Sequence, residues 1–504
     1  MKYLTSFMVA TTALFPAAAS FADVTPQDVW VQALLAAKIS GQTWTTAELE
    51  ATGDTLIAHD VTIEMPGVSD IITLDGTIPQ IIMKQLSDGK VEISIPDVVS
   101  YDMSVEGRLN LGVEPTTIKS SMAIDNVMIA SGSADDLSFE ILPGSITYLT
   151  QKQVKKGISI VPEQIITLLG VQGSATQSTS GEEVSSNWAI QVDAVNAVTN
   201  GSTSDMTLNT SYKIAPLSLA AEFTTSAAPS DAPLGFLEAL EGTGTYTMGN
   251  TSFEMTTGSA ELMMHIVGET EASTLGVTIA EGALTYAGTS ANTEVVLDGS
   301  AVPFPQVDFG LESADFSLTM PFLASEKEEA FGLKLALEKL RLPEIFWMIL
   351  DPSTQMAHDP ATLILDVSGD MTMDANLLNP TEILALSEDK LPLFPTNMLL
   401  NELFLSIAGA TLTGTGEATF VAQDDLIPGT MPLETAAGTL SLTGGTALIN
   451  TLAQTGLVPP QISVTAKIML GMFARPGAEP DSYVTDIELG ADGTLTANGN
   501  AIPF

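Results

Sequence analysis

The stretch from Gly438 to Gly456, GTLSLTGGTALINTLAQTG, contains both kinds of secondary structure that we expect in this chain. Residues 439 to 443 alternate polar and apolar side chains, which is typical of a strand. After Gly444-Gly445 the apolar residues recur at helical spacing, and Gly456 follows where a glycine commonly ends a helix. This C-terminal unit is therefore expected to contain a strand followed by a helix.

The next apolar segment, between Pro460 and Phe473, fits either a helix or a strand. Its apolar residues share one helical face, but part of the segment also alternates apolar and polar residues as a strand does. The helical face would comprise Ile462, Ala466, Met469, Leu470 and Phe473. We favour the helix, because the segment is rich in good helix formers and begins at a proline pair.

A terminal hairpin is expected after this segment. Thr485, Ile487 and Leu489 alternate with acidic residues, as in a strand with one wet face. Asp492-Gly493 predicts a type I′ turn, in which both central residues need positive φ. Asn498-Gly499 predicts a second tight turn.

Three runs in this C-terminal part carry a resemblance: residues 442–449, 469–477 and 493–499. They resemble the closing segment of a family of exported bacterial proteins known as domain of unknown function 2125. The likeness extends over most of the chain and includes residues 359–362. The helix pair followed by an Asn-Gly hairpin also resembles the ends of AsmA-like envelope proteins, which are long, β-rich and associated with lipid movement. The resemblance implies an exported β-rich protein and brings no catalytic residue with it.

Upstream, strand-like alternation dominates the sequence. The chain after residue 22 is expected to open with a helix, in which Thr25 is the cap, Pro26 occupies the first turn and Asp28 completes a capping box. From Trp44 the apolar period changes to two, and runs such as 91–95 have one wet face, which is typical of antiparallel sheets. We therefore predict a β-dominated α+β protein, with long curved antiparallel β-meander sheets and a few short helices packed on the apolar face.

Turn and loop signals divide these strands. Asp75-Gly76 and Asp88-Gly89 predict turns, and the polar, Gly- and Ser-rich run 172–187 predicts a loop. Two further short helices are expected, one after Pro343 and one from Asn379 to Ser387.

The expected organisation has three parts. Residues 1–22 are a signal peptide, because Lys2 precedes an apolar run and small residues precede a cleavage site between Ala22 and Asp23. Residues 23–230 form an N-terminal helix plus antiparallel β domain, and residues 231–504 form a C-terminal β-rich domain with helices and the terminal hairpin. The Ala-, Pro- and Ser-rich run 226–233 is the expected boundary. The mature protein is expected to be periplasmic and soluble.

Composition restricts the chemistry and the partners. The chain has 61 acidic residues against 17 basic ones, a formal net charge of −44, so nucleic acid is not an expected partner. There is no cysteine, which excludes disulfides and thiolate metal sites. The three histidines, His59, His265 and His358, show no metal-binding spacing, and no catalytic motif is present. We therefore predict no catalytic residues, no cofactor and no metal site.

Two functional classes stay open. One is a binding module for an apolar ligand, such as a lipid or an acylated envelope component, in a groove lined by adaptable residues such as the 21 methionines. The other is a structural or protein-interaction component of the cell envelope without ligand or catalysis. An unfilled apolar groove would favour the first class, and a solid core would favour the second.

The first testable prediction concerns export. Protein isolated from the cells that make it should begin at Asp23, because the signal peptidase reads the small residues before it. Mass spectrometry of the intact protein measures this. Material that retains Lys2 would show that the segment is a membrane anchor instead.

Overall fold

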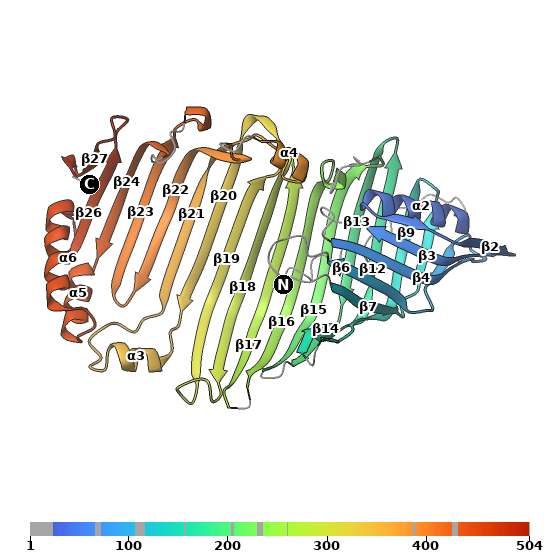
Figure 1. The fold of residues 1–504 in the computed structure, drawn as a ribbon, viewed down its shortest axis with the longest axis horizontal. Coiled ribbons are helices and arrows are strands. Elements are labelled where there is room, and N and C mark those ends of the chain that lie inside the picture. Colours follow the sequence, from blue (N-terminus) through green and yellow to red (C-terminus); the bar gives the residue numbers. More distant parts are fainter. Residues whose placement is uncertain are drawn as a thin grey trace. The chain divides into compact units, whose positions relative to one another are not determined.

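The computed structural model describes residues 24–65, 72–105, 116–155, 158–202, 206–228, 235–259, 261–386, 390–425 and 432–502. The expected signal peptide and the cleavage site at Ala22 and Asp23 lie outside these residues. Antiparallel strands dominate the structure, with a few short helices, so the predicted β-dominated α+β class is confirmed (Figure 1). The chain divides into two compact units, which are described separately.

Unit 1 comprises Met1–Gly282, Asp298–Pro303 and Leu378–Pro380, and unit 2 comprises Ala283–Leu297, Phe304–Leu377 and Thr381–Phe504. The boundary expected near residue 230 lies partly on residues 229–234, outside the described residues, and stays a prediction.

The described residues of unit 1 include the α-helix α2 (Pro26–Ile39) and a short 3-10 helix at Gly235–Leu237. Its strands are β1 (Thr43–Thr45), β2 (Glu48–Thr52), β3 (Thr55–Met65), β4 (Ile72–Gln85), β5 (Val91–Ser94), β6 (Val99–Val105), β7 (Thr116–Ile124), β8 (Met128–Gly132), β9 (Asp136–Thr150), β10 (Gln153–Lys155), β11 (Ile158–Val161), β12 (Glu163–Ser180), β13 (Glu183–Val192), β14 (Ala194–Ser202), β15 (Thr207–Ser226), β16 (Glu241–Gly258) and β17 (Met263–Ala280).

Helix α2 begins as the sequence predicts. The Thr25 side chain accepts from the Asp28 backbone N–H, and the Asp28 carboxylate accepts from the Thr25 backbone N–H, which completes the capping box. The buried face of α2 includes Trp30, which is 2% exposed, and Ala37, and it packs on the main hydrophobic core of unit 1. This core draws its other members from β1 and from β3 to β9.

Four long strands of unit 1 change neighbours along their length. β4 pairs with β6 over Ile72–Thr77 and with β5 over Ile82–Gln85. In the same way β9 pairs first with β8 and then with β7, while β12 and β15 each pair partly with β14 and partly with β13. The sheet therefore forks, and a second, smaller core of six buried residues lies among β12, β13, β14 and β15.

Unit 2 is a simpler meander. Its strands are β18 (Ala283–Asp298), β19 (Val307–Pro321), β20 (Ser325–Leu340), β21 (Ala361–Met373), β22 (Leu393–Ile407), β23 (Ala410–Phe420), β24 (Leu433–Thr443), β25 (Arg475–Pro476), β26 (Ser482–Leu489), β27 (Leu495–Ala497) and β28 (Asn500–Ala501). The remaining helices are α3 (Glu344–Leu350), α4 (Pro380–Ala385), the 3-10 turn Gln423–Asp425, α5 (Gly445–Gln454) and α6 (Pro460–Phe473). The segment that fitted helix or strand is therefore the helix α6.

The register of unit 2 gives its sheet one largely apolar face. Directly paired residues share a face, and one such row crosses six strands from β20 to β26. The row consists of Leu337, Leu363, Leu405, Leu412, Leu442 and Tyr483. All six side chains are only half-buried. The opposite face carries ionic side chains, including the paired Lys334, Asp366 and Glu402.

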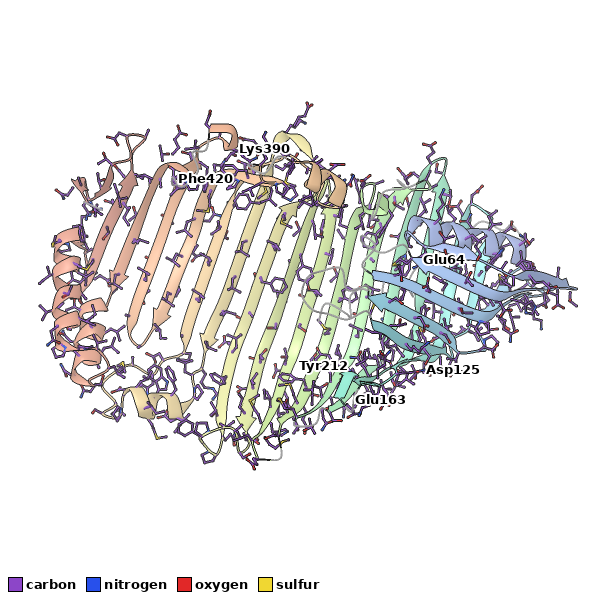
Figure 2. All side chains as sticks on the ribbon, viewed as in Figure 1. Glu64, Asp125, Glu163, Tyr212, Lys390 and Phe420 are labelled. Atoms are coloured by element: carbon purple, nitrogen blue, oxygen red, sulfur yellow. The ribbon has the colours of Figure 1, made fainter. Side chains whose placement is uncertain are left out.

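Three helices of unit 2 lie at the same end of its strands. α3 connects the end of β20 to the start of β21, and α5 and α6 connect the end of β24 to the start of β26. The end of β24 lies beside the starts of β23 and β26, because Thr443 pairs with both Thr411 and Ser482. Lys390 and Phe420 mark the opposite strand end, where β22 begins and β23 stops (Figure 2).

Both edges of β26 are occupied. One edge pairs with β24 over Ser482–Leu489. The other edge pairs with β25 over Tyr483–Val484 and with β27 over Ile487–Leu489. The N-terminus of α5 is fixed to the same region, because the Asp481 carboxylate accepts from the backbone N–H groups of Thr446 and Ala447 at 3.2 and 2.9 Å.

Three local predictions are wrong. Asp75-Gly76 is no turn but part of β4, where Gly76 lets Tyr101 approach, since a Cβ there would lie 2.9 Å from the Tyr101 ring. The polar run 172–187 is no loop but most of the β12–β13 hairpin, because its alternating polar face is exposed while residues such as Ala175 and Val184 are buried.

The third correction concerns the terminal turns. Asp492-Gly493 does form a turn, but only Gly493 has positive φ, so the turn is not of type I′. Asn498 and Gly499 both have positive φ, 48° and 77°, and connect β27 to β28 as a type I′ turn does. The predicted turn at Asp88-Gly89 is confirmed.

Candidate functional site

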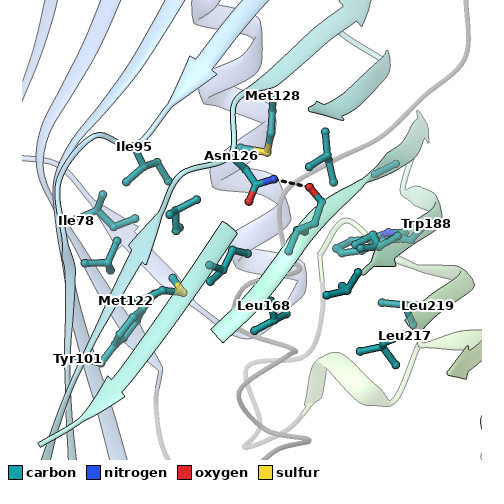
Figure 3. Close-up of a pocket in the computed structure, with 18 of the residues that line it drawn as sticks. Ile78, Ile95, Tyr101, Met122, Asn126, Met128, Leu168, Trp188, Leu217 and Leu219 are labelled. Atoms are coloured by element: carbon teal, nitrogen blue, oxygen red, sulfur yellow. Dashed lines mark hydrogen bonds between the residues drawn. The ribbon is translucent and has the colours of Figure 1, made fainter. Parts of the chain in front are cut away.

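Unit 1 contains an apolar cleft with a cavity volume of about 150 Å³ (Figure 3). Its walls come from both arms of the forked sheet: β6 and β7 on one side, β12, β13 and β15 on the other. None of the described residues that line it is charged. An apolar cavity of this size stays dry and can hold a group about as large as benzene.

The strands leave this space open because their regular pairing is interrupted. The register between β9 and β12 shifts on both sides of Val171, next to Gly170 and Gly173. Gly170 has a φ of 64°, which residues with a side chain rarely adopt. At this irregularity the backbone carbonyl of Val171 needs a donor from outside the ladder.

Asn126 supplies that donor. It lies between β7 and β8 and is 5% exposed. Its Nδ2 donates to the carbonyl oxygen of Val171 at 2.7 Å (Figure 3) and to that of Leu142 at 2.8 Å. Two acceptors fix the orientation of the amide, because only the NH₂ group can donate to both. Gly144 makes room for this contact, since a Cβ there would lie 2.8 Å from Asn126 Cγ.

The fixed amide places a polar atom in an apolar surrounding. Asn126 Oδ1 is buried and has no hydrogen-bond partner in the described structure. The indole Nε1 of Trp188, another lining residue, is likewise buried and unpaired. An unpaired buried polar atom costs roughly 1–3 kcal/mol. Both atoms are almost fully covered by protein, so the surface that the cleft presents is essentially apolar.

The phenol groups of the cleft stay neutral. Burial raises the pKa of Tyr101 to about 12, with a smaller contribution from the neighbouring Tyr148. Burial also raises the pKa of Tyr246. Because its lining is uncharged, the cleft suits a neutral group and would not hold a buried carboxylate or phosphate.

The apolar face of the unit 2 sheet is a second surface that consists mainly of apolar side chains. Among its residues outside the row described above, Leu333 is 45% exposed and its partner Leu318 is 41% exposed. The buried hydrophobic residues of unit 1 form two core clusters, whereas those of unit 2 are scattered. A wide sheet face that stays half-exposed is typical of a surface that contacts something apolar.

The three histidines lie in different parts of the structure, and each contacts an acidic side chain. His59 is next to Glu50 on the neighbouring strand, at 3.1 Å. His265 lies between Glu254 and Asp298, at 3.0 and 3.3 Å. His358 stacks on Trp347 at a centroid distance of 4.5 Å and lies 3.3 Å from Asp351.

The carboxylate of Asp351 holds the loop after α3. Burial opposes its ionisation, but the backbone N–H groups of Gln355 and Met356 and the His358 side chain together hold the pKa of Asp351 below its usual range. Within the described ranges no three His, Asp or Glu side chains converge as metal ligands would. The histidines therefore do not assemble a reactive centre in this part of the chain.

Sequence reasoning did not find the residues of the cleft. Ala175 lies in the run 172–187, for which the sequence predicts a loop, and Asn126 resembles any polar residue between two strands. The signals that could have pointed to them are Gly144 and the glycines at 170 and 173, which mark irregular pairing.

Comparison with known proteins adds no assignment, since no protein-family model, no curated protein and no solved structure matches the chain. Among the residues that the structure describes, no helix combines the length and apolar character needed to cross a bilayer.

The second prediction concerns Asn126. Replacing it by alanine removes the donors to two carbonyl groups and should destabilise unit 1 by about 2–4 kcal/mol. Urea unfolding followed by circular dichroism measures the change. The control is Asn200→Ala on the exposed surface of β14, which should change stability by less than about 0.5 kcal/mol. Equal effects of both variants would show that the two hydrogen bonds of Asn126 are not needed.

The third prediction concerns pH. Hydrogen bonds to Glu254 and then to Asp298 raise the pKa of His265 above 6.5. A raised pKa means that the folded state binds the proton more tightly, so this stabilisation is fully present below pH 6.5 and is lost as the pH rises through the folded pKa. Because the groups are partly exposed, the contribution should be below about 1 kcal/mol.

Comparing His265→Gln with the wild type measures this effect. Wild type should be the more stable protein at pH 5.5, and the difference should fade toward pH 8.5. Glu254→Gln, which removes the largest cause of the shift, should reduce the same pH dependence. A stability difference that is constant over this range would contradict the assignment.

Proposed function

We propose that this is an exported periplasmic protein that binds an apolar ligand, the acyl chain of a lipid or of an acylated envelope component, in the cleft of unit 1. The observation that carries the proposal is the apolar cleft, in which none of the described lining residues is charged. The resemblance to the domain of unknown function 2125 family and to AsmA-like envelope proteins supports export and contact with lipids.

The size of the cleft defines what enters it. About 150 Å³ accommodates the end of a chain rather than a whole lipid. Burying six methylene groups contributes roughly 5 kcal/mol before the cost of ordering the ligand. A charged headgroup has no counter-charge in the cleft, so it would stay in water at the opening.

The apolar face of unit 2 is a second, separate surface for an apolar ligand. Its half-buried leucines on adjacent strands would contact an acyl chain without any rearrangement of the backbone. The row through Leu363, Leu405 and Leu412 supports this reading, because it offers continuous apolar surface across neighbouring strands.

The alternative is a structural or protein-interaction component of the envelope that binds no ligand. The ionic face of the unit 2 sheet and the acidic surface would then be the contact surfaces. Under this alternative the cleft of unit 1 is an unfilled gap in the core, and blocking it would have no effect on any property except stability.

The fourth prediction tests the cleft. The fluorescent probe N-phenyl-1-naphthylamine should bind purified protein, and oleate should displace it. Leu168→Trp fills the cleft and should weaken probe binding at least about tenfold, since it replaces the space that the probe needs. The matched control is Leu169→Trp on the next residue of β12, which is 43% exposed on the opposite face and should bind as wild type does.

Circular dichroism melting of both variants shows whether they are folded. If a folded Leu168→Trp variant binds the probe as tightly as wild type, the cleft is not the binding site. If wild type binds neither the probe nor oleate, the alternative without a ligand is favoured.

A further inference from the structure

One strand end of unit 2 exposes an unusual number of apolar side chains, all on helices. On α6, Ile462 is 57% exposed, Ile468 56% and Met472 63%. Val464 and Met469 on the same helix are also more than half exposed. On α3, which lies at the same strand end, Met348 and Ile349 are 55% and 57% exposed.

The two sides of α6 are clearly different. Its inner side consists of Ser463, Ala466, Lys467 and Leu470, which are buried or half-buried at helical spacing. The apolar face predicted for this helix included Ile462 and Met469. Both side chains are exposed, so the prediction was wrong for these two residues. At about 100° per residue the exposed positions 461, 462, 464, 465, 468, 469 and 472 occupy one continuous arc, and five of them are large and apolar.

The charge of this region also departs from the rest of the chain. Residues 435 to 478 contain no aspartate or glutamate, although the whole chain has 61 acidic residues. The bases in this stretch are Lys467 and Arg475. The acids that flank this stretch, Glu434 and Glu479, are exposed, and α3 carries the exposed Glu344. Two further acids are directed at the protein itself, since Asp481 accepts from the first turn of α5 and Asp486 pairs with Arg475 at 2.7 Å.

These features fit a lipid surface better than a protein partner. An anionic bilayer repels an acidic protein everywhere except where acidic groups are missing. A broad apolar arc with few hydrogen-bonding groups suits hydrocarbon, which makes no directional contacts, whereas a protein interface carries about one hydrogen bond per 100–200 Å². At 14 residues α6 is too short to span a bilayer, but it is long enough to lie in the interface.

We propose that the outer side of α6, together with the exposed residues of α3, docks unit 2 onto the surface of a phospholipid bilayer. This site is separate from the cleft of unit 1 and does not depend on ligand binding there. The strands of unit 2 would then meet the membrane with the end that carries α3, α5 and α6.

The fifth prediction tests this docking. The full mature chain is mixed with vesicles of phosphatidylcholine, or of phosphatidylcholine with phosphatidylglycerol, and floated through a density gradient. Wild type should float with both kinds of vesicle. The double variant Ile468→Glu/Met472→Glu should lower the vesicle partition coefficient more than about tenfold, because it places two charges where hydrocarbon contacts are needed.

Matched controls separate this effect from a general loss of apolar surface. Leu391→Glu/Leu399→Glu also replaces two exposed leucines, 56% and 42% exposed, but outside the helical end of unit 2, and it should float as wild type does. Leu168→Trp, which blocks the cleft of unit 1, should float as wild type does as well. Circular dichroism melting confirms that each variant is folded.

Three outcomes would overturn the proposal. In the first outcome wild type stays at the bottom of the gradient with both kinds of vesicle. In the second outcome the α6 variant floats as wild type does. In the third outcome wild type is a dimer by light scattering, the α6 variant is a monomer, and neither floats, which would make this surface an interface between copies. A tryptophan at position 472 gives an independent readout, because Met472→Trp fluorescence should be quenched by brominated phosphatidylcholine if the helix enters the bilayer.

Discussion

The architecture of unit 1 depends on how the backbone groups of its long strands find partners where the sheet forks. Strands such as β4, β9 and β12 change neighbours part-way along their length. Near these changes the carbonyl groups of Val171 and Leu142 bond outside the ladder, and buried carbonyls without a partner would be costly. Asn126 satisfies two of them with a single amide. The cavity is thus a consequence of the fork, and the unpaired Oδ1 is a consequence of the way the fork is closed.

The two units bury their apolar side chains to different extents. In unit 1 the forked strands and α2 bury large side chains completely, including Met83 and Leu137. In unit 2 the helices α3, α5 and α6 lie at one strand end, and the leucine row of the sheet stays half-buried. Since apolar area exposed to water raises the free energy of the folded state by roughly 25 cal/mol per Å², such a face gains stability from any apolar partner.

Much of the fold could be predicted from local sequence, because the relevant physics is local. The capping box at Thr25, the period-two strands and the helix α6 follow from spacing and capping chemistry. The predicted secondary structure was wrong where it depends on contacts with residues far away in the sequence. Gly76 looks like half of a turn signal, but it is a glycine because the Tyr101 ring lies against it. The polar run 172–187 looks like a loop, although its strands β12 and β13 pair with β9 and β15, which lie farther away in the sequence.

The candidate site was beyond sequence reasoning for the same reason. The cleft draws its walls from residues that are separated by up to two hundred positions, from Trp44 to Tyr246. No periodicity links Asn126 to Val171, since their contact exists only because β9 and β12 slip in register. In contrast, the acid-free run 435–478 is visible in the sequence, but its exposure depends on which side of α6 faces the sheet.

The short pieces around β26 have a consequence for how the protein behaves at high concentration. A sheet with an open final strand offers a template to which another chain can add by backbone pairing. Here that edge is occupied at both ends, by β25 with its proline and by β27, so no long run of free N–H and C=O groups remains on β26 in the described structure. The type I′ turn at Asn498-Gly499 folds β28 back on β27 and shortens the outermost strand to a few residues. This edge of the meander therefore offers little unpaired backbone to another chain, while the faces of the sheet stay accessible.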